Sequence, residues 1–152
     1  MIELRCILLP LDASNLAVRA LHVAMHLAST TSAEIVLLHV RPDAASLNAD
    51  LAEADLEALE SESDNLLNLA RPVAERFGVP PSRVRAEVRA GGIARAILET
   101  ADELSADLII MATHGRRGLL EHLIGSTTER VLSQATASVL VVKPDGFPYL
   151  RD

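Results

Sequence analysis

The sequence contains very few aromatic residues. Among its 152 residues there are no tryptophans, one tyrosine and two phenylalanines, although 49% of the chain is hydrophobic. A core must therefore be built mainly from leucine, valine, isoleucine and alanine. This composition suits layered packing, in which parallel strands are covered by helices.

Cysteine is nearly absent, and long apolar runs are missing. The single cysteine, Cys6, cannot form an internal disulfide, which favours a reducing compartment. No stretch approaches the roughly 20 apolar residues that a membrane-spanning helix needs. Charged residues and a proline interrupt the first apolar run, unlike a signal peptide. We therefore expect a cytoplasmic protein with no membrane partner.

Positive charge is scarce, and one long segment lacks it altogether. The formal net charge is −7, and residues 42–70 contain eight acidic residues but no lysine or arginine. The rest of the chain therefore carries a net charge of about +1. No basic stripe offsets this negative charge, so we expect no nucleic-acid partner. The acidic segment is interpreted as the solvated face of a helix.

Five short runs have the character of β-strands. Four are continuous apolar runs, typical of strands buried on both faces, whereas the third alternates and is predicted to lie near an edge. The five runs are Arg5–Leu11, Glu34–Val40, Val84–Val88, Asp107–Ala112 and Ser138–Val142.

Helical periodicity fills the gaps between the runs. Apolar residues recur at helical spacing over about residues 17–28, 56–77, 93–104 and 126–135. Regular alternation of strands and helices predicts right-handed crossovers and an α/β fold, with a five-stranded parallel sheet and helices on both faces. We expect one domain over residues 1–145 and a tail at residues 146–152.

Ligands of such sheets bind outside the carboxyl ends of the strands, where the strand order reverses. The residues to inspect are therefore those that follow strands, namely Pro10–Ser14, Val40–Asp43, Arg89–Gly92 and Ala112–Thr128. The last of these segments holds three of the seven glycines of the chain, Gly115, Gly118 and Gly125.

The end of this glycine-rich segment has the pattern of a helix start. Ser126 is predicted to be the N-cap, with Glu129 three residues later, as in a capping box. Unpaired backbone N–H groups at such a terminus attract phosphates, and Arg116 and Arg117 would add positive charge. A plain structural cap is the alternative. The spacing matches neither a Walker A loop nor a dinucleotide-binding fingerprint.

At this point the chain resembles the universal stress protein family over nearly its whole length. The resemblance is carried by Leu9–Asp12, Leu38–Val40, Gly91–Ile93, Asp107–Gly115 and the stretch from Gly125 to Pro144. Nucleotide-binding members have a glycine, two residues, a second glycine, nine residues, then glycine and serine or threonine. Gly115 and Gly125-Ser126 fit this pattern, but Ala112 stands in place of the first glycine.

The resemblance implies a flavodoxin-like, adenine-nucleotide-binding sandwich with strand order 3-2-1-4-5. It also implies ATP or a related adenine nucleotide as the ligand. Asp12 would lie near the sugar and base and is a candidate ligand of Mg²⁺, while Val40 would contact adenine through its backbone. The candidate nucleotide site comprises Pro10, Leu11, Asp12, Val40, Met111, Ala112, His114, Gly115, Arg116, Gly125, Ser126, Thr127 and Thr128.

The family resemblance further implies a stress-response sensor or adaptor that forms a homodimer through the Ser138–Val142 strand, using Val139 and Val141. Two alternatives stay open. One is a dimeric interaction protein that has lost nucleotide binding, which Ala112 keeps open. The other is a slow ATP hydrolase in which His114 or Asp12 has a chemical role, although no partner base for His114 is evident in the sequence. A flavin site is disfavoured because aromatic residues are so few.

Two histidines on the first predicted helix, His22 and His26, have the i, i+4 spacing of a metal-binding pair. They lie on a polar stripe opposite the apolar face. We interpret them as solvated side chains rather than as metal ligands.

Overall fold

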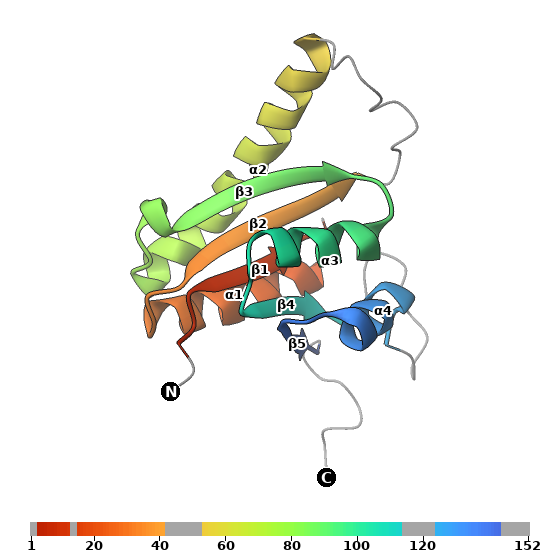
Figure 1. The fold of residues 1–152 in the computed structure, drawn as a ribbon. Coiled ribbons are helices and arrows are strands. Elements are labelled where there is room, and N and C mark those ends of the chain that lie inside the picture. The colour runs from red at the N-terminus through yellow and green to blue at the C-terminus, as the bar shows by residue number, and fades with distance from the viewer. Residues whose placement is uncertain (1–2, 13–14, 42–52, 114–123, 144–152) are drawn as a thin grey trace.

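The computed structural model describes residues 3–12, 15–41, 53–113 and 124–143. Strands and helices alternate along the chain (Figure 1). The elements are β1 (Cys6–Pro10), α1 (Asn15–Ser29), β2 (Glu34–Arg41), α2 (Glu53–Phe77), the short 3₁₀ helix η2 (Pro81–Arg83), β3 (Val84–Ala90), α3 (Ile93–Glu103), β4 (Leu108–Ala112), α4 (Ser126–Gln134) and β5 (Ser138–Val142).

The five strands form one parallel sheet with the order β3-β2-β1-β4-β5. This confirms the predicted fold and the position of the third strand at an edge. The chain reverses its direction of travel across the sheet between β1 and β4. The carboxyl ends of these two strands therefore form the switch point at which ligands of such sheets bind.

The core has two halves, one on each face of the sheet. Alternate residues of each strand point to opposite faces, as the pleat requires. Ile7 and Leu9 of β1 pack with α1 and α2, whereas Leu8 packs with α3 and α4. All three of these side chains are fully buried, because the central strand has helices on both sides. This arrangement explains the continuous apolar runs in the sequence.

The amino ends of β1 and β4 are joined by Asp107, the residue before β4. Its Oδ2 accepts hydrogen bonds from the backbone N–H groups of Arg5 (2.8 Å) and Cys6 (2.9 Å). These two bonds stabilise the carboxylate and lower the pKa of Asp107. The Cys6 thiol next to this contact is half-buried, and its burial raises the pKa of the thiol. This end of the sheet is therefore a structural junction, remote from the switch point.

Helix α2 is the longest element, with 25 residues, and its amino-terminal end projects away from the sheet, above β3 (Figure 1). It ends where Gly78 adopts a φ of +69°, a left-handed conformation that glycine adopts without strain. Glu57, Glu60 and Asp64 are exposed, which confirms a solvated acidic face for these residues. Glu62 is the exception, since it lies half-buried at 3.4 Å from Arg41.

The two histidines of α1 are not simply solvated. His22 and His26 both contact the ring of Phe77 edge to face, with ring centroids 6.1 and 5.9 Å apart. Their stripe therefore packs in part against the end of α2, which the helical periodicity of α1 alone could not reveal. Across the described residues, no three metal-ligating side chains gather into a group that could hold an ion.

In the part of the chain that the structure describes, no helix is both long enough and apolar enough to cross a membrane.

Candidate functional site

A pocket of about 160 Å³ lies at the carboxyl ends of β1, β2 and β4, next to the first turns of α3 and α4. We call it the switch-point pocket, because it lies where the strand order reverses. It is lined by Pro10, Leu11, Asp12, Ala17, Leu38, His39, Val40, Ile93, Ile97, Met111, Ala112, Thr127 and Thr128.

Most of the pocket wall is apolar. Leu11, Val40, Ile97 and Met111 are buried and are held by the sheet and by α3, whereas Ile93 at the start of α3 is 44% exposed and lies at the rim. These side chains come from β2, α3 and β4 and from the residue that follows β1. Such a surface offers dispersion contacts to a flat ring that enters from solvent.

The pairing of β1 with β2 continues one residue beyond β1. The backbone N–H of Leu11 donates to the carbonyl of Leu38 at 2.8 Å, and Nδ1 of His39 lies 3.4 Å from the carbonyl oxygen of Leu11. The next residue, Asp12, is therefore held at the wall of the pocket and is half-buried there. Asp12 and His39 are the titratable side chains among the described lining residues.

Two hydrogen bonds attach the start of α4 to the end of β4, and a third attaches the end of β4 to β5. The hydroxyl of Thr128 donates to the carbonyl of Ala112 (3.2 Å), and the N–H of Gly125 donates to the carbonyl of Thr113 (3.0 Å). The N–H of Thr113 in turn donates to the carbonyl of Val142 on β5 (3.1 Å). The amino terminus of α4 is thereby fixed at the edge of the pocket.

The predicted capping box at this terminus is wrong. Gly125 is the N-cap of α4, Ser126 is the first helical residue, and no side-chain hydrogen bond caps this helix start. Glycine has no side chain that could accept from the N–H groups of the first turn, and the exposed Ser126 is one residue too late to do so. Within the described part of the chain, no side chain caps these N–H groups, which can bind solvent or an anion.

Helix α3 begins at the pocket in the same way. Its N-cap is Gly92, again without a side-chain cap. Gly91 has a φ of +121°, which only glycine adopts readily, and its N–H donates to the carbonyl of Arg41 at 2.9 Å. The turn from β3 into α3 thus places Ile93 at the rim of the pocket.

Most of the predicted site residues come together here. Eight of them line the switch-point pocket: Pro10, Leu11, Asp12, Val40, Met111, Ala112, Thr127 and Thr128. Gly125 and Ser126 stand at the adjacent helix start but do not line the pocket. His114, Gly115 and Arg116 lie outside the described residues.

Five lining residues were not predicted as site residues: Ala17, Leu38, His39, Ile93 and Ile97. The sequence carried a signal for most of them. Leu38 and His39 stand beside Val40, and Ile93 follows the Gly91-Gly92 step. Ile97 is one turn further along α3 and was interpreted only as part of the apolar face of that helix.

The sheet is parallel and has this strand order, and a pocket lies at its switch point beside two helices whose N-cap residues are glycines. This is the architecture of the flavodoxin-like, adenine-nucleotide-binding type of α/β sandwich. The chain belongs to the universal stress protein family, since the model of that family matches residues 3–143. The match covers every described helix and strand.

Two curated relatives cover nearly all of the chain. The chain is 34% identical over 141 residues to universal stress protein MJ0531 of Methanocaldococcus jannaschii, covering 90% of this chain and 81% of the relative. It is 31% identical over 145 residues to universal stress protein G of Salmonella typhimurium, covering 91% of this chain and 99% of the relative.

Solved structures of the same fold are also similar. The protein MJ0577, described as hypothetical, superposes with a TM-score of 0.75 at 30% identity, covering 94% of this chain and 98% of that one. A universal stress protein from Archaeoglobus fulgidus, solved in complex with dAMP, superposes with a TM-score of 0.65 at 20% identity, covering 94% of this chain and all of that one. A universal stress protein solved in complex with cAMP superposes with a TM-score of 0.67 at 21% identity, covering 93% of this chain and 98% of that one. The last two show likeness of fold.

Proposed function

We propose that this protein binds an adenine nucleotide, with ATP as the first candidate, in the switch-point pocket, and that it acts as a stress-response sensor or adaptor. The observation that carries the proposal is the position of an apolar pocket directly beside the uncapped start of α4. A base and a phosphate chain need these two environments side by side. The cAMP and dAMP complexes of two universal stress proteins with this fold support the same ligand class.

In this proposal each part of the ligand has its own partners. The base lies between the apolar side chains of the pocket, along the backbone of Val40. The ribose lies near Asp12, which would also hold Mg²⁺ if the metal accompanies the phosphates. The phosphates accept from the N–H groups of Ser126 and Thr127 and from their hydroxyls. Arg116 would add charge.

The direct test is to denature the purified protein, identify any released nucleotide, and titrate the protein with ATP and Mg²⁺ in a calorimeter. We expect bound adenine nucleotide, or binding in the micromolar range that Gly125→Val abolishes. If no nucleotide is released and no heat is seen at several temperatures, the protein is a nucleotide-independent interaction protein and the proposal is wrong.

We also propose that the protein forms a homodimer through β5. This strand pairs only with β4, so among the described residues its outer edge has no partner. Leu140 on this strand is 37% exposed, and Val139 and Val141 are half-buried. An exposed apolar edge strand favours pairing with a second copy. Sedimentation equilibrium should show a dimer at micromolar concentration that Leu140→Lys converts to monomer, and a wild-type monomer would contradict this.

A further inference from the structure

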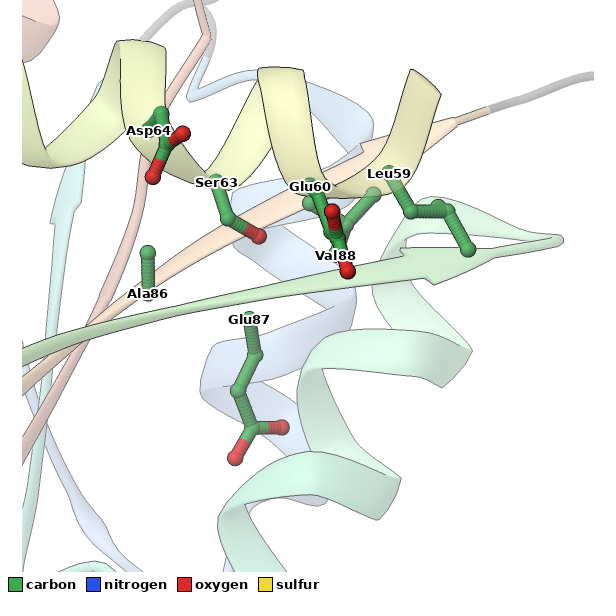
Figure 2. Close-up of a pocket in the computed structure, with 7 residues that line it drawn as sticks. All are labelled: Leu59, Glu60, Ser63, Asp64, Ala86, Glu87 and Val88. Atoms are coloured by element: carbon green, nitrogen blue, oxygen red, sulfur yellow. The ribbon is translucent and has the colours of Figure 1, made fainter. Parts of the chain in front are cut away.

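A second depression, larger than the switch-point pocket, runs between α2 and β3 (Figure 2). It has a volume of about 410 Å³ and is open along its length. We call it the α2–β3 groove. Its lining residues are Leu59, Glu60, Ser63 and Asp64 from α2, and Ala86, Glu87 and Val88 from β3.

The floor of the groove is the unpaired edge of the sheet. Among the strands that the structure describes, β3 pairs with β2 alone. The N–H of Gly91, just after β3, donates to the carbonyl of Arg41 on β2. Because successive residues of a strand direct their N–H and C=O groups to opposite sides, those of Ala86 and Val88 point away from β2. The groove therefore presents a row of main-chain donors and acceptors that a further strand could pair with.

Helix α2 forms the roof of the groove. Figure 2 shows Ser63 pointing from α2 toward β3 and Leu59 at the end of the groove. Glu60 and Asp64, one helical turn apart, are exposed at the rim. No lysine or arginine occurs between residues 42 and 70 to neutralise them. Within the described chain, α2 forms an ion pair through Glu62, which contacts Arg41. Neither of these two residues lines the groove.

The opposite face of β3 carries a different charge pattern. Glu87 points away from α2 (Figure 2) and is paired with Arg85 at 2.6 Å and with Arg89 at 3.0 Å. Arg89 also contacts Glu103 of α3 at 2.7 Å. Burial disfavours the Glu87 carboxylate, but the hydrogen bonds from Arg89 and Arg85 outweigh burial and lower its pKa. A strand added beside β3 would thus meet the carboxylates of α2 on one side, and on the other side arginines that are paired with Glu87 and Glu103.

We propose that the α2–β3 groove binds an extended, basic segment of a partner protein, which adds to the sheet as a strand beside β3. Its main chain pairs with the outward N–H and C=O groups of Ala86 and Val88. Alternate side chains are lysine or arginine, whose aliphatic stems lie on Leu59 and whose charges reach Glu60 and Asp64. The intervening side chains face Arg85 and Arg89 and are small, polar or acidic.

Strand addition fits this groove for two reasons. A helix in the groove would leave the outward N–H and C=O groups of β3 unpaired, whereas an extended chain pairs them and still places every second side chain under α2. An added strand would direct every second side chain toward Glu60 and Asp64 of α2, and the others toward the face of β3 on which Arg85 and Arg89 are paired with Glu87. The inference is independent of nucleotide binding, because no residue lines both the groove and the switch-point pocket.

The probe for this proposal is a fluorescently labelled peptide of nine residues in which lysine alternates with threonine. We expect binding to the full chain with a dissociation constant of tens of micromolar at low salt, since exposed charge pairs and main-chain bonds each contribute little. A peptide of the same composition with its lysines in one block should bind about tenfold more weakly. Equal binding of the two peptides would mean general attraction to negative charge and would overturn the proposal.

Backbone methylation of the peptide tests the strand pairing without altering the protein. Methyl groups on alternate peptide nitrogens remove the N–H donors on one edge of the added strand. Methylation of the edge that faces β3 should abolish binding, whereas methylation of the other edge should leave it within about twofold. If both methylated peptides bind as well as the unmodified one, no strand is added and the proposal fails.

The double variant Glu60→Gln/Asp64→Asn tests the rim. It should weaken binding of the alternating peptide about tenfold, the effect expected of two exposed ion pairs. The matched control is Glu34→Gln/Glu75→Gln, which removes the same net charge from exposed positions outside the groove and should leave affinity within about twofold. Equal losses in both variants would overturn the proposal. So would self-association that only the rim variant changes, because the occupant would then be a second copy.

Discussion

The two hollows of this molecule differ in almost every physical respect. The switch-point pocket is small, has mostly apolar walls, and lies beside two helix starts at which the N-cap residue is glycine. The α2–β3 groove is more than twice as large, lies open along an edge strand, and has carboxylates at its rim. Helix starts attract anions, whereas carboxylates attract cations.

This contrast shows how one α/β sheet can provide sites of opposite charge preference. The pocket uses the carboxyl ends of the central strands, where parallel strands and crossover helices leave a crevice. The groove lies at a lateral edge, where β3 has a neighbour on one side only among the described strands. We expect the pocket to select a phosphorylated small molecule and the groove to select a basic extended chain, and variants should separate the two.

The largest effect is expected from a negative charge at the start of α4. Ser126→Asp should weaken ATP binding about a hundredfold or more, because the new carboxylate repels the phosphates. The fold should not suffer, since an acidic residue in the first turn stabilises a helix. Calorimetry measures the affinity, and Ser133→Asp in the last turn of α4 is the matched control. Affinity for the alternating peptide should stay unchanged, and a loss of both affinities would contradict the separation of the sites.

A charge reversal at the groove rim should have the next largest effect. Glu60→Lys/Asp64→Lys should weaken binding of the alternating peptide about thirtyfold, because attraction is replaced by repulsion. Fluorescence anisotropy measures this change. ATP affinity of the same variant should remain within about twofold. A strong change in ATP affinity would show that the two sites are coupled, contrary to our expectation.

A smaller effect is expected from Ala112→Gly, which restores the first glycine of the family pattern. Ala112 is one of the residues that line the switch-point pocket. Removal of its methyl group should strengthen ATP binding about threefold by allowing closer approach of the ligand, at a cost of roughly 0.5–1 kcal/mol in the free energy of unfolding. Ala137→Gly, at a half-buried position outside the pocket, is the control for the backbone effect. Unchanged ATP affinity would mean that the methyl does not approach the ligand.

The smallest effect concerns the amino ends of the strands, remote from both sites. Asp107→Asn should lower the free energy of unfolding at pH 7 by about 1 kcal/mol, since charge-assisted bonds from Arg5 and Cys6 weaken. The pKa of Asp107 is lowered in the folded state, so its stabilisation is present above the unfolded pKa of about 3.9.

The difference between wild type and Asp107→Asn should therefore be lost as the pH falls from about 5 through the folded pKa, and the two proteins should converge at lower pH. Urea denaturation across this range measures it. Both ligand affinities should be unaffected at pH 7. A difference that persists undiminished at low pH would mean that the side chain acts through packing instead of charge.

Much of the fold could be predicted because the relevant signals are local. Ser138–Val142 agrees with the predicted strand to the residue, and the other strands differ by one or two residues at their ends. Parallel strands that are buried on both faces appear in the sequence as continuous apolar runs. The third strand alternates because one face of β3 packs on the core through Val84 and Ala86, whereas its other face carries charged residues. It extends to Ala90 through a charged residue that the apolar pattern does not mark.

The errors have a common cause, because each depends on contacts between residues far apart in the chain. The capping box was assigned from spacing alone, but the cap position depends on where the chain leaves β4 and on the bond from Gly125 to Thr113. The histidines of α1 were interpreted without the contact that Phe77 makes across 50 residues of sequence. The α2–β3 groove was not predicted, because it depends on how α2 lies against β3.

The sequence by itself determined the class of fold, the positions of the elements and the candidate residues at the strand ends, because hydrophobic period and turn residues act over a few neighbours. The strand order followed from the family resemblance. Only the tertiary structure decided which candidates share a wall, which helix start lacks a cap and which strand edge lies open beneath α2. Those outcomes depend on contacts between residues far apart in the chain, whose geometry no local pattern encodes.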